Sequence, residues 1–301
     1  MARTRDTVVA EVLVRLRLEA ATHQMMVEGW VNDVIQDVHG RYDWYWSLDR
    51  AIVQTVLDKT AGTIAVSLSG TSITGTGTAF ESADVGSYIQ FSGNDDWYRI
   101  TAVESFLGLT IEKPFTGTAA LTAGTYTLRK VFYTLSDAER ILSVTQAITA
   151  RNLTCLQYKD FDRYLPFSES TGKADVYCLY GVDSSNNLQF CVHPHSDEVY
   201  NLEVRYKKKA TEDSIVATPE KWRHVYIDGA LVRGYEYVAF GQPDFDKTMV
   251  REKKSDYEAT IARMKQSAGP TSDYHPRLQN RDVQMTLPVP RLPDGLSIPV
   301  D

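Results

Sequence analysis

The sequence predicts an α+β protein: a helical bundle with an antiparallel β meander, an inserted small all-β barrel or sandwich module, and an extended C-terminal tail. Three observations indicate this fold class. Apolar residues recur at helical spacing near both ends of the chain. A Gly/Thr/Ser-rich stretch with alternating apolar residues lies between them. Six of the eleven prolines fall within residues 270–301. The predicted boundaries are 1–52 and 134–266 for the helical body, about 174–209 for its meander, 53–133 for the inserted module and 267–301 for the tail.

Two helices are predicted between about Thr4 and Gly40, with a break near Thr22–His23 and Gly40 as the residue that ends the second helix. The segment RYDWYWSL follows directly. Its rings either cap the helical core or anchor a subunit interface, where Trp and Tyr are enriched. The candidate interface residues are Tyr42, Trp44, Tyr45 and Trp46.

Residues 53–133 differ in character, because short apolar residues alternate there with Gly, Thr and Ser. A turn is predicted at Gly75–Gly77, and another at Gly93–Asn94–Asp95 between two strands. The segment KPFTGTAALTAGTYTLRK supplies a further turn and a closing strand. Five or more short strands predict a small barrel or sandwich. Since helical sequence flanks both ends, we expect this module to be an insertion.

After the module, LSDAERILSVTQAI predicts a helix in which Ser136 is the N-cap and Glu139 completes a capping box. A meander of three strands is then predicted. Its strands are Val176–Tyr180, Leu188–Val192 and Tyr200–Tyr206, and the first two flank a turn at Asp183–Asn187.

Two more helices form a predicted αα-hairpin before the tail. Thr218–Pro219 marks the start of the first and Gly241 its end. Pro243 precedes the second, highly charged helix, which is predicted to run to about Gln266. Its apolar side is predicted to hold Tyr257, Ile261 and Met264.

The tail is predicted to be a docking segment. Its prolines exclude a helix or a central strand, yet apolar residues alternate with them. A chain stiffened in this way loses little entropy on binding, and its backbone groups stay free to pair with a partner. The candidate docking residues are Met285, Leu287, Pro288, Val289, Pro290, Leu292, Pro293, Leu296, Ile298 and Val300.

Composition excludes several classes of protein. No run of eighteen apolar residues is present, so no transmembrane helix is expected, and the charged N-terminal stretch lacks a signal-peptide apolar block. Three cysteines, an odd number, argue against a secreted disulfide scaffold. The net charge of −7 offers no basic footprint for DNA or anionic lipid.

Catalytic and metal sites are not favoured by any motif. His193, His195 and Asp197 allow a metal site, but a polar turn around Pro194 is the favoured interpretation. Cys178 and Cys191 are predicted to be cross-strand neighbours with reduced thiols. The pairs Asp160 and Asp162 and Asp95–Asp96 are interpreted as loop carboxylates, and Lys207–Lys209 as a solvated strand edge. We therefore expect no enzyme activity, no metal and no cofactor.

The order of these segments resembles the head–tail connector adaptor family of tailed bacteriophages. The resemblance lies in WVNDVIQDVHGRYDWYW, YTLSDAERILSV, GKADVYCLY, NNLQFCVHPHSDEVYNLEVRYKKKA and IDGALVRGYEYVAF. The segment GTGTAFESADVGSYIQFSGNDDWYRITAV is similar to small barrel inserts of phage virion proteins.

The resemblance implies a structural virion protein at the head–tail junction, assembled in the host cytoplasm. It implies a ring, usually of twelve subunits, beneath the portal protein, with a tail or nozzle protein below and DNA passing through without sequence-specific binding. The C-terminal segment would reach the portal, and no membrane is involved. The resemblance leaves the partner of the β module open, with tail fibres as one candidate. Two alternatives remain: a tail-side virion protein whose β module binds tail fibres or glycan, and a carbohydrate-active enzyme.

Overall fold

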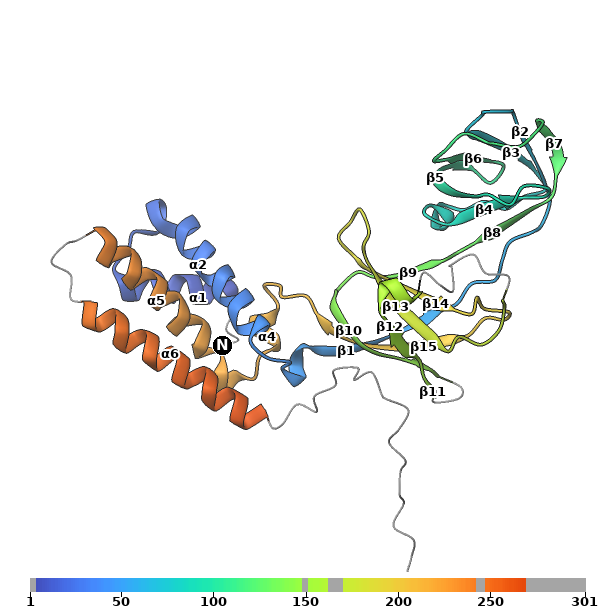
Figure 1. Ribbon diagram of the computed structural model, residues 1–301. Helices are drawn as coiled ribbons and strands as arrows, with labels where there is room; N and C mark the ends of the chain where they lie inside the picture. Colours follow the sequence, from blue (N-terminus) through green and yellow to red (C-terminus); the bar gives the residue numbers. More distant parts are fainter. Residues whose placement is uncertain (1–3, 148–150, 162–169, 242–246, 269–301) are drawn as a thin grey trace, which may run out of the picture.

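The computed structural model describes residues 4–147, 151–161, 170–241 and 247–268, which form three lobes in a row (Figure 1). The helical lobe contains the long helices, the central β lobe contains two four-stranded sheets, and the outer β lobe contains one curled seven-stranded sheet. The protein is therefore a mixed α and β structure in which all but one of the strand pairings described are antiparallel.

The helical lobe is made of α1 (Arg5–Leu16), α2 (Ala20–Gly40), α4 (Ser214–Ala217), α5 (His224–Gly241) and α6 (Lys247–Ala268). The predicted break near Thr22–His23 is wrong, because α1 ends at Leu16 and is capped by Arg17, which adopts φ 55° and donates its backbone N–H to carbonyl groups of the last turn. Thr22 instead lies in the first turn of α2 and donates its hydroxyl to Glu19 O at 3.3 Å.

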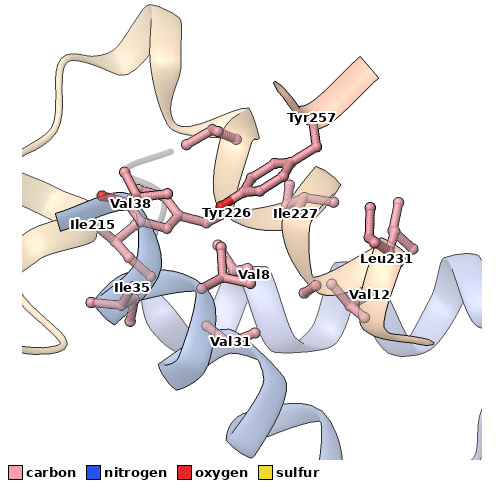
Figure 2. Packing of buried hydrophobic residues seen from close by; sticks show 14 of the residues in the cluster. Val8, Val12, Val31, Ile35, Val38, Ile215, Tyr226, Ile227, Leu231 and Tyr257 are labelled. Atoms are coloured by element: carbon pink, nitrogen blue, oxygen red, sulfur yellow. The ribbon is translucent and has the colours of Figure 1, made fainter. Parts of the chain in front are cut away.

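One apolar core joins the four long helices. Figure 2 shows side chains of α1 and α2 pointing toward those of α5 and α6. The predicted apolar side of α6 is confirmed, since Tyr257, Ile261 and Met264 are all buried. Further buried members are Val8, Val12, Val31, Ile35, Val38, Tyr226, Ile227 and Leu231.

The start of α5 was predicted wrongly. Thr218 ends α4, where its hydroxyl donates to Ser214 O at 2.8 Å, and Pro219 precedes a short 3₁₀ turn, η3 (Glu220–Trp222). Helix α5 begins only at His224 and ends at the predicted Gly241. Pro243 lies outside the described residues.

The central β lobe packs two sheets around a shared core. The first sheet has the order β1 (Leu48–Gln54), β15 (Asn201–Lys208), β10 (Ala138–Gln146), β11 (Arg151–Asn152). The second has the order β12 (Thr154–Leu156), β13 (Val176–Val182), β14 (Leu188–His193), β9 (Phe132–Leu135), and the short helix α3 (Tyr158–Phe161) follows β12.

The predicted meander is only half right. Strands β13 and β14 form the predicted hairpin, but the third strand, β15, joins the other sheet, between β1 and β10. The place beside β14 is taken by β9, which comes from the start of the lobe. The order of the strands in the two sheets therefore differs from their order along the chain.

The helix predicted in LSDAERILSVTQAI is wrong, because this segment forms strand β10. Its buried residues Ala138, Ile141 and Val144 are spaced by three, which mimics a helix. The pairing register with β15 shifts between Ala138 and Arg140 and again between Ile141 and Ser143. Each irregularity adds a residue to the strand and changes the spacing of its inward side chains.

The outer β lobe has its own apolar core. Its strands are β2 (Thr63–Val66), β3 (Ser72–Thr76), β4 (Tyr88–Phe91), β5 (Trp97–Ser105), β6 (Gly108–Ile111), β7 (Leu121–Gly124) and β8 (Tyr126–Arg129), in the order β7-β2-β3-β6-β5-β4-β8. The Gly93–Asn94–Asp95 turn is confirmed between β4 and β5. The Gly75–Gly77 turn is wrong: Gly75 lies within β3, where a Cβ would collide with Thr78.

The chain enters and leaves the outer β lobe at one point. Lys59 and Leu128 exchange two backbone hydrogen bonds, each of 2.9 Å. Adjacent ends of this kind are typical of an inserted domain. The predicted boundaries at 53 and 133 stay a prediction.

Candidate assembly surfaces

The aromatic segment links the helical lobe to the central β lobe, between α2 and β1. Trp44 is fully buried, and its Nε1 donates to Val38 O at 2.6 Å. Trp46 stacks on Trp44 with 4.9 Å between ring centroids, and Tyr42 packs against Trp44 at 5.0 Å. Tyr45 lies edge-on to Trp46 and is 60% exposed. Trp44 thus belongs to the core, whereas an interface role for the four rings stays a prediction.

A group of charged side chains, here called the proximal joint, connects the helical lobe to the central β lobe. It consists of His39, Asp43, Glu139, Arg140 and Lys207. Lys207 Nζ donates to His39 O at 2.8 Å and lies 3.6 Å from Glu139 Oε1 and 3.8 Å from Asp43 Oδ1. Arg140 Nη2 binds Asp43 Oδ2 at 2.5 Å. The joint therefore pairs one buried cation, Lys207, and one partly exposed cation, Arg140, with two half-buried carboxylates.

Histidine 39 is held by the same joint. Its Nε2 lies 2.6 Å from Lys208 O and 3.1 Å from Glu139 Oε2. Burial lowers the pKa of His39, and the nearby Lys207 charge lowers it further, against the opposing effects of Lys208 O and Glu139. Burial and Lys207 outweigh these two acceptors, so the net effect lowers the pKa of His39 and favours the neutral imidazole.

The prediction of a solvated edge at Lys207–Lys209 is wrong for Lys207, which is only 3% exposed. The helical lobe covers this end of β15. Lys207, which would be exposed to solvent on the strand alone, is therefore buried. Lys209 Nζ also binds within the chain, donating to Ser136 O at 3.0 Å. No local sequence signal distinguishes Lys207 from its neighbours; only the tertiary arrangement does.

A cavity of about 390 Å³ opens beside the proximal joint. It is lined by residues of both lobes, among them His39, Trp46, Ser136, Asp137, Lys208 and Asp213. The lining mixes charges of both signs with one indole ring, so it has no dominant chemistry that would select a ligand.

A second charged group, the distal joint, connects the central and outer β lobes. It consists of Asp58, Arg129 and His195. Arg129 Nη2 donates to Asp58 Oδ2 at 2.7 Å, and His195 Nε2 lies 2.8 Å from Asp58 Oδ1. The Arg129 guanidinium also lies over the Trp97 ring, 5.1 Å from its centroid. Burial raises the pKa of Asp58, but the contacts with His195 and Arg129 outweigh burial and leave this pKa below its usual value.

The residues considered for a metal site are not brought together. His193 packs edge-on against Phe161, while His195 binds Asp58. Asp197 Oδ1 accepts the hydroxyl of Tyr200 at 2.7 Å. Within the residues that the structure describes, no three His, Cys, Asp or Glu side chains are grouped to hold a metal ion.

The other candidate residues have ordinary structural roles. Cys178 and Cys191 are buried and face each other across β13 and β14, as predicted for cross-strand neighbours. Asp160 lies in α3, and Asp162 lies outside the described residues. Asp95 and Asp96 are exposed in the β4–β5 turn, where Asp96 Oδ2 accepts the hydroxyl of Thr116 at 2.6 Å.

The candidate docking residues from Met285 to Val300 also lie outside the described residues, so their partner stays a prediction. Elsewhere, large apolar side chains are exposed at both ends of the molecule. On the helical lobe these include Met25 (86% exposed) and Val14; on the outer β lobe they include Phe106 (71% exposed) and Leu107, at the tip of the β5–β6 hairpin. None of the helices described combines the length and apolar character needed to cross a membrane.

Comparison with known proteins gives one family. The family model described as SU10 adaptor protein matches residues 94–280, which is more than half of the chain. The match runs from β5 through the central β lobe to α6 and beyond. No curated protein sequence matches this chain. The extent of the family match shows that the chain belongs to the SU10 adaptor protein family and is a phage adaptor protein.

Proposed function

We propose that this chain is a structural subunit of an oligomeric ring that binds beneath the portal of a tailed phage, joins the capsid to the tail and extends the DNA channel. The observation that carries the proposal is membership of the adaptor family. The role is structural rather than enzymatic, because an adaptor acts by binding other virion proteins. It places the protein in the virion, at the head–tail junction.

Three features of the chain support this role. Its three lobes form an elongated subunit with a helical end and a β end (Figure 1), so each end can meet a different neighbour. The proline-rich stretch from Pro270 onward is suited to inserting into a groove of the portal. The net charge of −7 per subunit would give a ring an acidic surface, which repels DNA phosphates and lets DNA slide.

Imaging a mixture of the purified chain with a candidate portal tests the proposal. We expect a closed ring of about twelve subunits with the symmetry of its portal. Deletion of residues 270–301 should abolish portal attachment while the subunit stays folded. A second variant tests the side chains alone and should also lose attachment. In it, serine replaces the apolar docking residues while every proline is kept: Met285, Leu287, Val289, Leu292, Leu296, Ile298 and Val300. Attachment by the truncated chain would contradict the docking role of the tail.

The outer β lobe carries the runner-up proposal, in which it binds a tail fibre or glycan. The exposed Phe106 and Leu107 at the β5–β6 tip favour a protein partner there. Replacing both with serine should abolish fibre attachment and leave portal binding intact. Tight glycan binding by the chain, or turnover of a glycan, would favour the alternatives instead.

A further inference from the structure

The outward side of α2 is unusual for a helix in water. Its exposed residues Thr22, Met25, Gly29, Asn32 and Gln36 are three or four positions apart, so they share one face. None of them is charged, whereas the solvent face of an amphipathic helix normally carries charged residues. Met25 is the most exposed large apolar side chain among the residues described. This set of five residues is called the α2 face below.

Among the residues that the structure describes, none accounts for the glycine at position 29. It lies in the middle of α2, where glycine is the least favourable residue after proline, and a Cβ there would meet no atom within 4 Å. Gly229 in α5 is different, because a Cβ there would lie 2.6 Å from Val34 Cγ1 and 2.8 Å from Tyr257 Cε2. Gly229 lets helices of the same chain approach closely. Gly29 would allow the same close approach, but on a surface that none of the described helices covers.

Charges at the edge of the α2 face and on α6 are complementary. Glu19 and Asp33 are exposed, and among the described residues no Lys, Arg or His nitrogen lies within 4.0 Å of their carboxylates. On α6, Arg251, Lys254 and Arg263 are exposed and likewise have no carboxylate within 4.0 Å in the described part of the chain.

The remaining charges of α6 are mostly neutralised within the chain. Asp256 binds Lys253 at 3.6 Å and Glu258 binds Arg41 at 2.5 Å, so Glu252 is the exposed carboxylate of α6 for which the described residues supply no cation. The exposed surface of α6 therefore has an excess of positive charge. It also exposes the small residues Ser255 and Ala262, next to which another helix can lie closely.

The two surfaces are distinct parts of the helical lobe. Helix α5 lies between α2 and α6 (Figure 1) and packs against both. A contact between the α2 face of one copy and α6 of the next is therefore head-to-tail, the type of contact that closes into a ring. A contact between two α2 faces would instead oppose two acidic edges, with Asp33 and Glu19 on both sides, and would stop at a dimer.

We propose that the α2 face of one subunit packs against α6 of its neighbour, with Gly29 at the close approach and the acidic edge of α2 against the cations of α6. This inference rests on the proposed ring and identifies the surfaces that form it.

Cysteine cross-linking of the full-length chain tests the contact. Met25→Cys and Ala262→Cys are made in separate preparations, mixed with portal and treated with a short bismaleimide. We expect a cross-linked dimer in the mixture and none in either preparation alone. The wild-type chain is the control for its own thiols, of which Cys178 and Cys191 are buried. A dimer formed by Met25→Cys alone, or a ring that assembles without the mixed cross-link, would overturn the proposal.

Charge reversal gives a second measurement. Asp33→Arg, and separately Arg251→Glu with Lys254→Glu, should each lower the amount of ring by about tenfold. Mixing the two variants should restore part of it. Glu112→Arg, an exposed reversal on the outer β lobe, is the matched control and should leave the ring unchanged. Circular dichroism of each variant confirms that its subunit is folded; equal ring yields for folded variants and control would contradict the contact.

These outcomes separate the inference from the proposed function. If rings form on the portal without the Met25–Ala262 cross-link, only the interface is wrong. If the cross-link forms in the free chain but no ring ever binds a portal, the interface stands and the proposed function is wrong.

Discussion

Lys207 Nζ lies 2.8 Å from the carbonyl oxygen of His39, which places a buried ammonium group at the C-terminal end of α2. Helix C-termini favour cations, because their last carbonyl groups have no partner within the helix. The same lysine comes from β15, so one side chain connects the helical lobe to the central β lobe. This contact accounts for a buried lysine in a run of three that the sequence alone marks as solvated.

Replacing Lys207 with methionine tests this role. The change keeps the aliphatic stem but leaves His39 O and the carboxylates of Glu139 and Asp43 without the ammonium. We expect a loss of about 1–3 kcal/mol in the free energy of unfolding, measured by urea denaturation. Lys208→Met is the matched control. Lys208 is half-exposed and pairs with Asp49 at 3.4 Å, so its loss should be below about 1 kcal/mol. Equal effects at the two positions would contradict a structural role for Lys207.

The pH dependence of stability follows from His39. Burial and Lys207 lower its pKa, so the folded protein takes up a proton there less readily than the unfolded chain. The contribution of neutral His39 to the free energy of unfolding is complete above the unfolded pKa of 6.5, and it is lost as the pH falls below that value. Thermal melts between about pH 7.5 and about pH 5.5 should show this decline.

His39→Gln should reduce the decline, because the amide can still donate to Lys208 O but does not titrate. Burial also lowers the pKa of His193, so a smaller decline should remain in this variant. An unchanged pH profile in His39→Gln would show that another group is responsible.

The local chemistry of several turns and helices could be predicted from the sequence. The Asp183–Asn187 turn formed as predicted, because Asp183 Oδ1 accepts the backbone N–H groups of Ser185 and Asn187 at 2.8 Å each. The apolar side of α6 followed from helical spacing alone. Both are set by residues close in the sequence.

Features that depend on distant contacts could not be predicted. The spacing of Ala138, Ile141 and Val144 mimics a helix because of irregularities in the pairing of β10 with β15, sixty or more residues away. The place of β15 between β1 and β10 depends on three segments that are far apart in the sequence: the outer β lobe separates β1 from β10, and strands β11 to β14 separate β10 from β15. Likewise, the distal joint could not be predicted from a sequence motif, because its residues Asp58, Arg129 and His195 come together only in the folded chain.

Asp58→Ala tests that joint. The change removes the carboxylate that contacts both Arg129 and His195, and Arg129 has a side chain only 7% exposed. We expect a loss of about 2–4 kcal/mol near neutral pH. The pKa of Asp58 is lower in the folded protein than in the unfolded chain. The stabilisation by Asp58 is therefore present above the unfolded pKa and is lost as the pH falls through the folded pKa.

The difference between wild type and Asp58→Ala should therefore shrink in acid. Asp49→Ala provides the comparison, since Asp49 is exposed and pairs with Lys208 at its surface. Its effect should stay below about 1 kcal/mol. Urea denaturation at neutral and acidic pH measures the stability loss of each variant. If the loss in Asp58→Ala were the same at both pH values, the role given to the Asp58 carboxylate would be contradicted.

Alanine substitutions at two glycines should have opposite effects. At Gly229 the new methyl group would meet the stiff side chain of Val34 at 2.6 Å, so we expect a loss of about 1–3 kcal/mol from overpacking. At Gly29 the methyl group meets open space in the middle of a helix, and we expect a gain of up to about 1 kcal/mol. Thermal denaturation of the two free subunits measures both. A destabilised Gly29→Ala subunit would mean that Gly29 has a role within the chain.

Removing the outer β lobe tests whether it is an inserted domain. Residues 60–127 are replaced by two glycines, which leaves Lys59 and Leu128 next to each other, as their paired backbone hydrogen bonds place them. Asp58, Arg129 and His195 remain, so the distal joint is kept. Because the apolar cores of the outer β lobe and the helical lobe are separate, the helical signal in circular dichroism should persist, with a cooperative melt. The deletion removes Tyr88, which packs against Phe132 at 6.3 Å between ring centroids, so Phe132 loses this contact and a modest fall in melting temperature is expected. Loss of the helical signal would show that the seven-stranded sheet is required for the rest of the chain to fold.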